Sequence, residues 1–103
     1  MSVLLEFSMF PTDRGESVSA DVSQANAAIR DSGHPYRLTP MGTVVETETL
    51  PEALAVIQSA YDALSPRSRR IYASLKMDIR EGVSGRLEGK IASVERRIGS
   101  VQT

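Results

Sequence analysis

The spacing of hydrophobic residues changes several times along the chain. The order of these changes constrains the fold more than any other feature of the sequence. Residues 3–10 and 71–80 alternate, so that every second side chain is apolar, which is typical of a strand with one buried face. Between them lie two segments with helical spacing and two short stretches rich in β-branched residues. The pattern therefore predicts the order strand, helix, strand, strand, helix, strand.

Three helices are predicted from spacing and end signals. The first spans residues 17–32, with Ser17 as N-cap and Gly33 in a positive-φ conformation after its end. Its core-facing residues recur at helical spacing: Val18, Val22, Ala25 and Ile29. The second begins after Thr49, which has capping-box spacing with Glu52, and ends at Ser65. Its predicted apolar stripe is Leu50, Leu54, Ile57, Tyr61 and Leu64. The third spans residues 84–98. Its predicted apolar stripe is Leu87, Ile91, Val94 and Ile98, which we expect to be buried in its own subunit or in a neighbouring one.

The predicted fold is an α+β, ferredoxin-like βαββαβ sandwich with an additional C-terminal helix. Strands at residues 36–39 and 43–47 complete two β-α-β units, and right-handed crossovers then place the first and third strands in the centre of the sheet. Residues 1–103 are expected to form a single domain. Helices would cover one face of the sheet. The other face is expected to present a row of mixed character: Glu6, Ser8, Phe10, Tyr72, Ser74, Lys76, Asp78 and Arg80.

Composition excludes several classes of function. The net charge of −1 gives no basic field for nucleic acid or an anionic membrane, and the strand at residues 43–47 has no aromatic side chain to stack a base. Cysteine is absent, and the single histidine, His34, lies in a Gly-His-Pro turn. We therefore expect no metal site, no cofactor and no catalytic triad. No apolar run approaches the roughly 18 residues of a membrane span, and a cytoplasmic location is expected.

Three stretches carry a resemblance to a known family. "LLEFSMFP", "YRLTPMGTVVE" and "LKMDIREGVSGRLEGKIASVERRIG" follow in the order and spacing of the small stand-alone thiamine-binding proteins, which the chain resembles from about residue 2 to residue 99. The resemblance implies a ferredoxin-like fold, a homotetramer built through sheet contacts, and binding of thiamine or its hydroxymethylpyrimidine part. Thr47 departs from the family pattern, because the resemblance leads us to expect glycine after Glu46.

The residue types fit the chemistry of thiamine, which combines an aminopyrimidine ring with a cationic thiazolium. Such a ligand needs an apolar wall, a few hydrogen-bond partners and often a carboxylate. The predicted walls are Phe10 and Met41. The predicted hydrogen-bond partners are Ser8, Thr39 and Thr43. The predicted carboxylates are Glu46 and Asp78, with Glu6 as a further choice.

Alternatives stay open for each of these residues. The charged row of Lys76, Asp78 and Arg80 is equally consistent with a salt-bridge ladder or a subunit interface, and residues 39–43 with ordinary turn chemistry. The sequence therefore favours a homo-oligomeric carrier or sensor. The alternatives are an enzyme acting on a thiamine-related pyrimidine and a structural oligomer without ligand.

Overall fold

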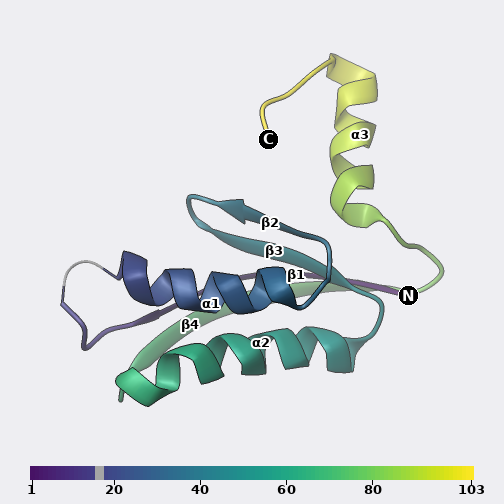
Figure 1. The fold of residues 1–103 in the computed structure, drawn as a ribbon. Coiled ribbons are helices and arrows are strands. Elements are labelled where there is room, and N and C mark those ends of the chain that lie inside the picture. The colour runs from purple at the N-terminus through teal and green to yellow at the C-terminus, as the bar shows by residue number, and fades with distance from the viewer. Residues whose placement is uncertain (16–17) are drawn as a thin grey trace.

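The computed structural model of the chain describes residues 1–15 and 18–103 and confirms the predicted order of elements (Figure 1). The strands are β1 (Ser2–Pro11), β2 (Tyr36–Thr39), β3 (Gly42–Thr47) and β4 (Ile71–Arg80). The helices are α1 (Ser19–Asp31), α2 (Leu50–Leu64) and α3 (Arg86–Ile98), and the short 3₁₀ turn η1 (Ser65–Arg67) leads from α2 into β4.

The four strands form one antiparallel sheet in the order β2-β3-β1-β4, which is the ferredoxin-like arrangement. The first and third strands are central, as predicted. The pairing of β1 with β4 sets Glu6 opposite Lys76 and Phe10 opposite Tyr72, so the predicted mixed row does share one face of the sheet. We call this face, which α1 and α2 leave uncovered, the open face.

The core lies between the other face of the sheet and the two helices α1 and α2. These helices run side by side over the sheet in Figure 1. Alternation along β1 supplies one wall of the core, because Val3 and Leu5 have no exposed surface. The buried apolar residues are Val3, Leu5, Phe7, Met9, Ala25, Ile29, Val45, Ala53, Val56, Ala60 and Leu64.

The helix ends follow the predicted signals where the structure describes them. The Thr49 hydroxyl accepts a hydrogen bond from the Glu52 N–H, which confirms Thr49 as the N-cap of α2. The Glu52 carboxylate accepts from the Thr49 hydroxyl, whereas in a full capping box it would accept from the Thr49 N–H. Gly33 has a φ of 83° just after α1, as its position requires. The expected N-cap of α1, Ser17, lies outside the described residues.

The predicted apolar stripe of α2 was wrong for Leu54 and Tyr61, whereas Leu64 is buried and Ile57 packs against the core. The buried residues of this helix are Ala53, Val56, Ala60 and Leu64, whereas Leu54 and Tyr61 are about half exposed. Small side chains let α2 pack closely on α1 and β1, so the helix turns its alanines inward. The larger residues are left at the side of the helix layer.

The third helix, α3, is anchored at its first turn and then leaves the sheet (Figure 1). Leu87 and Ile91 are partly buried, but Val94 is 45% exposed and Ile98 is 71% exposed. Only the first half of the predicted stripe is therefore packed in its own chain. Between α3 and the open face lies a cavity of about 490 Å³, with Leu4 and Val44 on its sheet side.

Candidate ligand-binding site

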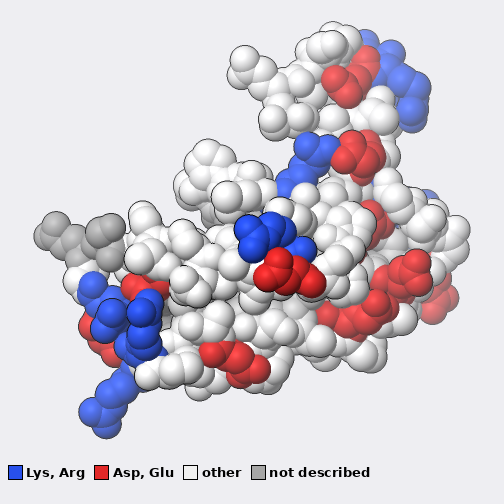
Figure 2. Space-filling model, in the orientation of Figure 1, with Lys and Arg blue, Asp and Glu red and all other residues white. Residues whose placement is uncertain are grey.

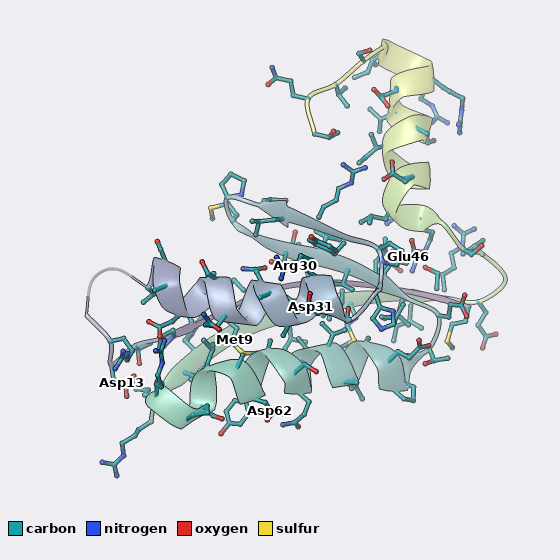
Figure 3. The ribbon with its side chains drawn as sticks, viewed as in Figure 1. Met9, Asp13, Arg30, Asp31, Glu46 and Asp62 are labelled. Atoms are coloured by element: carbon teal, nitrogen blue, oxygen red, sulfur yellow. The ribbon has the colours of Figure 1, made fainter. Side chains whose placement is uncertain are left out.

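A cavity of about 360 Å³ lies beside the start of β3, where β1 continues beyond its pairing with β3. The strand β1 pairs with β3 only from Val3 to Phe7, but it pairs with β4 as far as Pro11. The gap beside β1 is enclosed by α1 and by the turn between β2 and β3, and Figure 3 shows Met9 beneath α1. Its volume is in the range of small-molecule sites.

The walls of the cavity are mostly apolar, because the apolar side of the amphipathic helix α1 faces β1 and the turn between β2 and β3. The helix contributes Val22, Ala25 and Ile29, and its N-cap residue Val18 also lines the cavity; the spacing predicted all four as core-facing. Phe7 and Met9 of β1 form the opposite side. A flat, uncharged ring system fits such a slot better than a hydrated ion.

Two polar side chains meet in the cavity. The Thr43 hydroxyl donates to the Asn26 Oδ1 at 2.9 Å, and the Asn26 Nδ2 donates to the Val22 carbonyl at 3.0 Å. Thr43 is buried, and Asn26 is partly buried. Together they offer both acceptor and donor capacity inside an apolar surface.

The main chain of Met9 supplies further hydrogen-bonding groups. The Thr12 N–H donates to the Arg70 carbonyl across the β1–β4 pair, so even-numbered residues of β1 bond β4, and odd-numbered residues point their peptide groups toward β3. Because the β3 ladder stops opposite Phe7, the N–H and C=O of Met9 have no strand partner within the described residues. They face the side of β1 on which the cavity lies.

The turn at residues 39–42 closes one side of the cavity and is held by its own hydrogen bonds. The Thr39 hydroxyl accepts from the Met41 N–H at 3.2 Å and donates to the Gly42 carbonyl at 2.9 Å. A side chain at Gly42 would place its Cβ 2.9 Å from the Phe7 carbonyl oxygen, so only glycine lets the turn approach β1 this closely. Met41 is 88% exposed at the tip.

The structure brings five of the seven predicted site residues to this cavity: Ser8, Phe10, Thr39, Met41 and Thr43. Phe10 also contacts Tyr72 on the open face, with ring centroids 5.6 Å apart and the ring planes tilted by 37°. Glu46 and Asp78 are not among the lining residues. Glu46 lies at the other end of β3, where α3 begins, well away from Met9 in Figure 3.

Glu46 and Arg86 instead form a buried polar network that holds α3 to the sheet. The Glu46 carboxylate accepts the Arg86 and Leu87 N–H groups, each at 3.0 Å, and therefore caps the helix from a distant strand. It also accepts the Ser2 hydroxyl at 2.5 Å. The Arg86 guanidinium donates to the Ser2 carbonyl at 2.8 Å and pairs with Asp78 at 2.8 Å.

Two members of the charged row on the open face, Lys76 and Asp78, form ion pairs. Asp78 binds both Arg86 and, at 3.0 Å, Lys90 of α3, while Lys76 pairs with Glu6 at 3.3 Å. The Lys90 hydrogen bond, reinforced by Arg86, holds the pKa of Asp78 below its ordinary value despite some burial. Burial raises the pKa of Glu46, but its bonds from Ser2, Leu87 and Arg86 outweigh this, and the net shift is downward.

These pKa shifts predict acid lability of the α3 anchor. A depressed carboxyl pKa contributes stability above the ordinary pKa near 4, and this contribution is lost as the pH falls through the lower value of the folded state. We expect the unfolding midpoint in urea to be nearly constant from pH 6 to 8 and to fall below about pH 4. Glu46→Gln should lower the midpoint at pH 7 and flatten the fall in acid. An equally steep fall in this variant would show that other groups cause the lability.

Some residues of the site were not predicted from the sequence. Asn26 follows Val22 by one helical turn, so a polar residue inside an apolar stripe was an available signal. Nothing local marks Arg86 as buried, because its partners Ser2 and Asp78 come from distant strands. The peptide group of Met9 lacks a partner in β3 because β3 begins where it does. The spacing of residues predicts the first residue of a strand only to within one or two positions.

Within residues 1–15 and 18–103, no cluster of three histidine, aspartate or glutamate side chains is placed to hold a metal ion. None of the helices described is long and apolar enough to cross a membrane. On the face shown in Figure 2, basic side chains gather at the end of the molecule where α2 ends, and acidic side chains lie mostly toward the opposite end of the helix layer.

Fold and cavity together define a small α+β protein of ferredoxin-like topology with an apolar slot of about 360 Å³ beside β1. Comparison with known proteins narrows the class. Residues 5–95 match the family model described as "Thiamine-binding protein". The chain is also 43% identical to a UPF0045 protein of Mycobacterium bovis over 96 residues, which covers 93% of this chain and 94% of the relative. The chain therefore belongs to the thiamine-binding protein family.

Solved structures agree with this assignment. A hypothetical protein of Methanocaldococcus jannaschii superposes with a TM-score of 0.81 at 29% identity, covering 90% of this chain and 95% of the other. A protein of Thermotoga maritima, described as a putative thiamine biosynthesis/salvage protein, has a TM-score of 0.78 at 20% identity, covering 91% and 99%. The second likeness is one of fold alone.

Proposed function

We propose that residues 1–103 form a single thiamine-binding-type domain, and that its cavity binds thiamine or the hydroxymethylpyrimidine part of thiamine. The observation that carries this proposal is the pairing of an apolar slot with the Thr43–Asn26 hydrogen bond and the open Met9 peptide group. An aminopyrimidine has donors and acceptors along one edge and flat faces. The family assignment supports the same ligand class.

The charge of the lining residues indicates which half of thiamine enters. No carboxylate is among the described residues that line the cavity, and burial of a cation without a counter-ion is costly. The neutral pyrimidine ring is therefore placed in the slot, and the thiazolium at its opening. There the apolar side chains of Phe10 and Met41 offer contact without desolvating the charge completely.

The cavity under α3 is a poorer candidate for the same ligand. Its basic side chains are paired, Arg37 with Glu88 and Lys90 with Asp78. A cationic ligand would meet three basic residues there, since Arg86 also lines it. We therefore assign thiamine to the cavity beside Met9.

Calorimetry with three ligands tests the proposal. Thiamine and hydroxymethylpyrimidine should both bind, with similar affinity, whereas the isolated hydroxyethylthiazole should bind much more weakly. If the thiazole bound as well as thiamine and the pyrimidine did not bind, the assignment of the two halves would be reversed. If none of the three bound, the thiamine proposal would fail.

Thr43→Val is expected to weaken thiamine binding by about 0.5–1.5 kcal/mol, because it removes one neutral hydrogen-bonding group from the cavity wall. A matched control is Thr47→Val, since the Thr47 hydroxyl donates to the Thr49 carbonyl at the far end of the same strand. Both variants should lose similar stability, but only the first should lose affinity. Equal affinities in the two variants would move the ligand away from Thr43.

The protein is proposed to act as a homotetrameric carrier or sensor in the cytoplasm. The open face supports self-association, because Phe10 and Tyr72 lie on it among paired charges and Tyr72 is 56% exposed. An enzyme acting on a thiamine-related pyrimidine is the alternative. It would need proton-transfer groups, and none of the described side chains that line the cavity is of a type that titrates near neutral pH.

A further inference from the structure

Met9 is a nearly buried residue whose main-chain N–H and C=O have no hydrogen-bond partner among the described residues. Met9 is 6% exposed, and neither group bonds to β3, to a turn or to a side chain within residues 1–15 and 18–103. Buried main-chain groups are almost always paired, because an unpaired one costs about as much as a lost hydrogen bond. An open donor and an open acceptor beside an apolar slot therefore point to a ligand that supplies the missing pair.

The earlier odd-numbered residues of β1 show what this ligand would replace. Phe7 lies opposite Thr43 of β3, and Leu5 lies opposite Val45. In an antiparallel ladder, the N–H and C=O of one such residue point the same way and exchange bonds with a single residue opposite. The residue that would lie opposite Met9 belongs instead to the turn between β2 and β3, so the ladder is one residue pair too short.

We propose that the N–H and C=O of Met9 bind the edge of the pyrimidine that carries the amino group, so that the ligand takes the place of the missing residue of β3. Along this edge, a ring nitrogen with a free electron pair lies next to the carbon that bears the amino group. The Met9 N–H donates to the ring nitrogen, and the Met9 C=O accepts from the amino group. This inference rests on the proposed function and specifies how the same site recognises its ligand class.

A ring bound in this way lies in the plane of the sheet, between β1 and the turn at residues 39–42. One flat face points to the helix layer, where Val18 and Val22 line the cavity, and Figure 3 shows Met9 beneath α1. The other flat face points toward the open face, on the side of Phe10. Polar main chain thus meets the edge of the ring and apolar side chains meet its faces, which is how a heteroaromatic ring is satisfied in a buried site.

The pairing predicts selectivity for the amino group. In a 4-oxopyrimidine of the same shape, an oxygen replaces the amino group and the neighbouring ring nitrogen carries a hydrogen. Its oxygen would then face the Met9 C=O, and its N–H would face the Met9 N–H. Both main-chain groups would stay unpaired, and the strand cannot turn over to correct the mismatch. The ligand class is therefore that of 4-aminopyrimidines.

Calorimetry on the wild-type protein with thiamine and its 4-oxo analogue, oxythiamine, tests this selectivity. Both ligands carry the same thiazolium, so they differ only at the edge assigned to Met9. Oxythiamine should bind about a hundredfold more weakly, since two buried groups lose their partners. Equal affinities would overturn the role of Met9 and leave the proposed function standing. Failure of both ligands to bind would overturn the two together.

A main-chain ester at residue 9 tests the donor directly. Replacing Met9 with the corresponding α-hydroxy acid in the full-length protein removes the N–H and keeps the methionine side chain. The bonds from β1 to β4 remain, because even-numbered residues of β1 make them. The ester should weaken thiamine binding about tenfold. It should not change the affinity for a thiamine analogue in which C–H replaces the ring nitrogen beside the amino-bearing carbon. Equal weakening of both ligands would show that the ester acts through the fold and would count against the pairing.

The Thr43→Val variant separates reading by the main chain from reading by side chains. Thr43 and Asn26 also offer donors and acceptors in the cavity, and an asparagine amide can turn over to match either an amino or an oxo group. If Met9 reads the edge, Thr43→Val should keep the preference of about a hundredfold for thiamine over oxythiamine. A preference that disappears in this variant would assign the selectivity to the side chains.

Hydrogen exchange of the unmodified protein gives an independent reading. Saturation with thiamine should slow exchange of the Met9 amide about tenfold or more, because the N–H gains a bond on binding. Phe7 provides the internal control, since its N–H already bonds β3 in the free protein. A thiamine complex in which the Met9 amide exchanges as fast as in the free protein would overturn the pairing.

Discussion

Replacing Arg86 with methionine is expected to lower the free energy of unfolding by about 3–5 kcal/mol, the usual cost of leaving a buried charge, here that of Glu46, without the opposite charge beside it. Arg86 is 6% exposed, and its guanidinium binds the Ser2 carbonyl and the Asp78 carboxylate. Methionine fills much of the same volume but donates nothing. Glu46, 7% exposed, would also lose the nearby positive charge.

A matched control lies on the same helix. Lys90 is also a cation and also binds Asp78, at 3.0 Å, but its side chain is 59% exposed. Exposed pairs contribute about 0–1 kcal/mol, so Lys90→Met should change stability by no more than that. Urea unfolding followed by circular dichroism measures both variants. Equal losses would mean that burial of Arg86 is not what makes the anchor strong.

Loss of the anchor should release α3 before the rest of the fold. The helix has 13 residues, and isolated helices of that length are marginal in water. Because Val94 and Ile98 are exposed, most of its attachment lies in the first two turns. In the Arg86→Met variant, the amides of α3 should therefore exchange faster than those of β1. Equal rates would show that α3 unfolds only with the core.

The fold could be predicted from the sequence because local and long-range signals agree. Alternation in β1 and β4, the N-cap at Thr49 and the glycine at residue 33 each specify one element, and right-handed crossovers leave one plausible sheet order. The exception is α2. Its largest apolar residues fit a helical stripe, but close packing on α1 favoured its alanines, and spacing alone does not reveal that competition.

The candidate site could be predicted only in part, because it depends on where strands end. Ser8, Phe10 and Thr43 were selected for chemistry and do line one cavity. Glu46 and Asp78 were selected on the same grounds, yet their carboxylates bind the α3 anchor. A carboxylate that caps a distant helix and one that meets a ligand look identical in the sequence. Only the register of β3 and the start of α3 distinguish them.

Replacing Val22 with tryptophan is expected to weaken thiamine binding at least a hundredfold, or by roughly 3 kcal/mol or more. Val22 lies on the side of α1 that lines the cavity and is only partly buried, so a larger ring can enter the open slot without displacing the core. The indole would then occupy the space assigned to the pyrimidine. The chain contains no tryptophan, so the fluorescence of this single residue reports where it lies.

The matched control is Gln24→Trp, which places the same ring two residues along on the exposed side of α1. Its emission should be that of a solvated indole, and its affinity for thiamine should equal that of the wild type. The Val22→Trp emission should be shifted to the blue and should not respond to thiamine. Because emission places the ring independently of binding, a blue-shifted Val22→Trp protein that still binds thiamine with wild-type affinity would place the ligand elsewhere on the molecule.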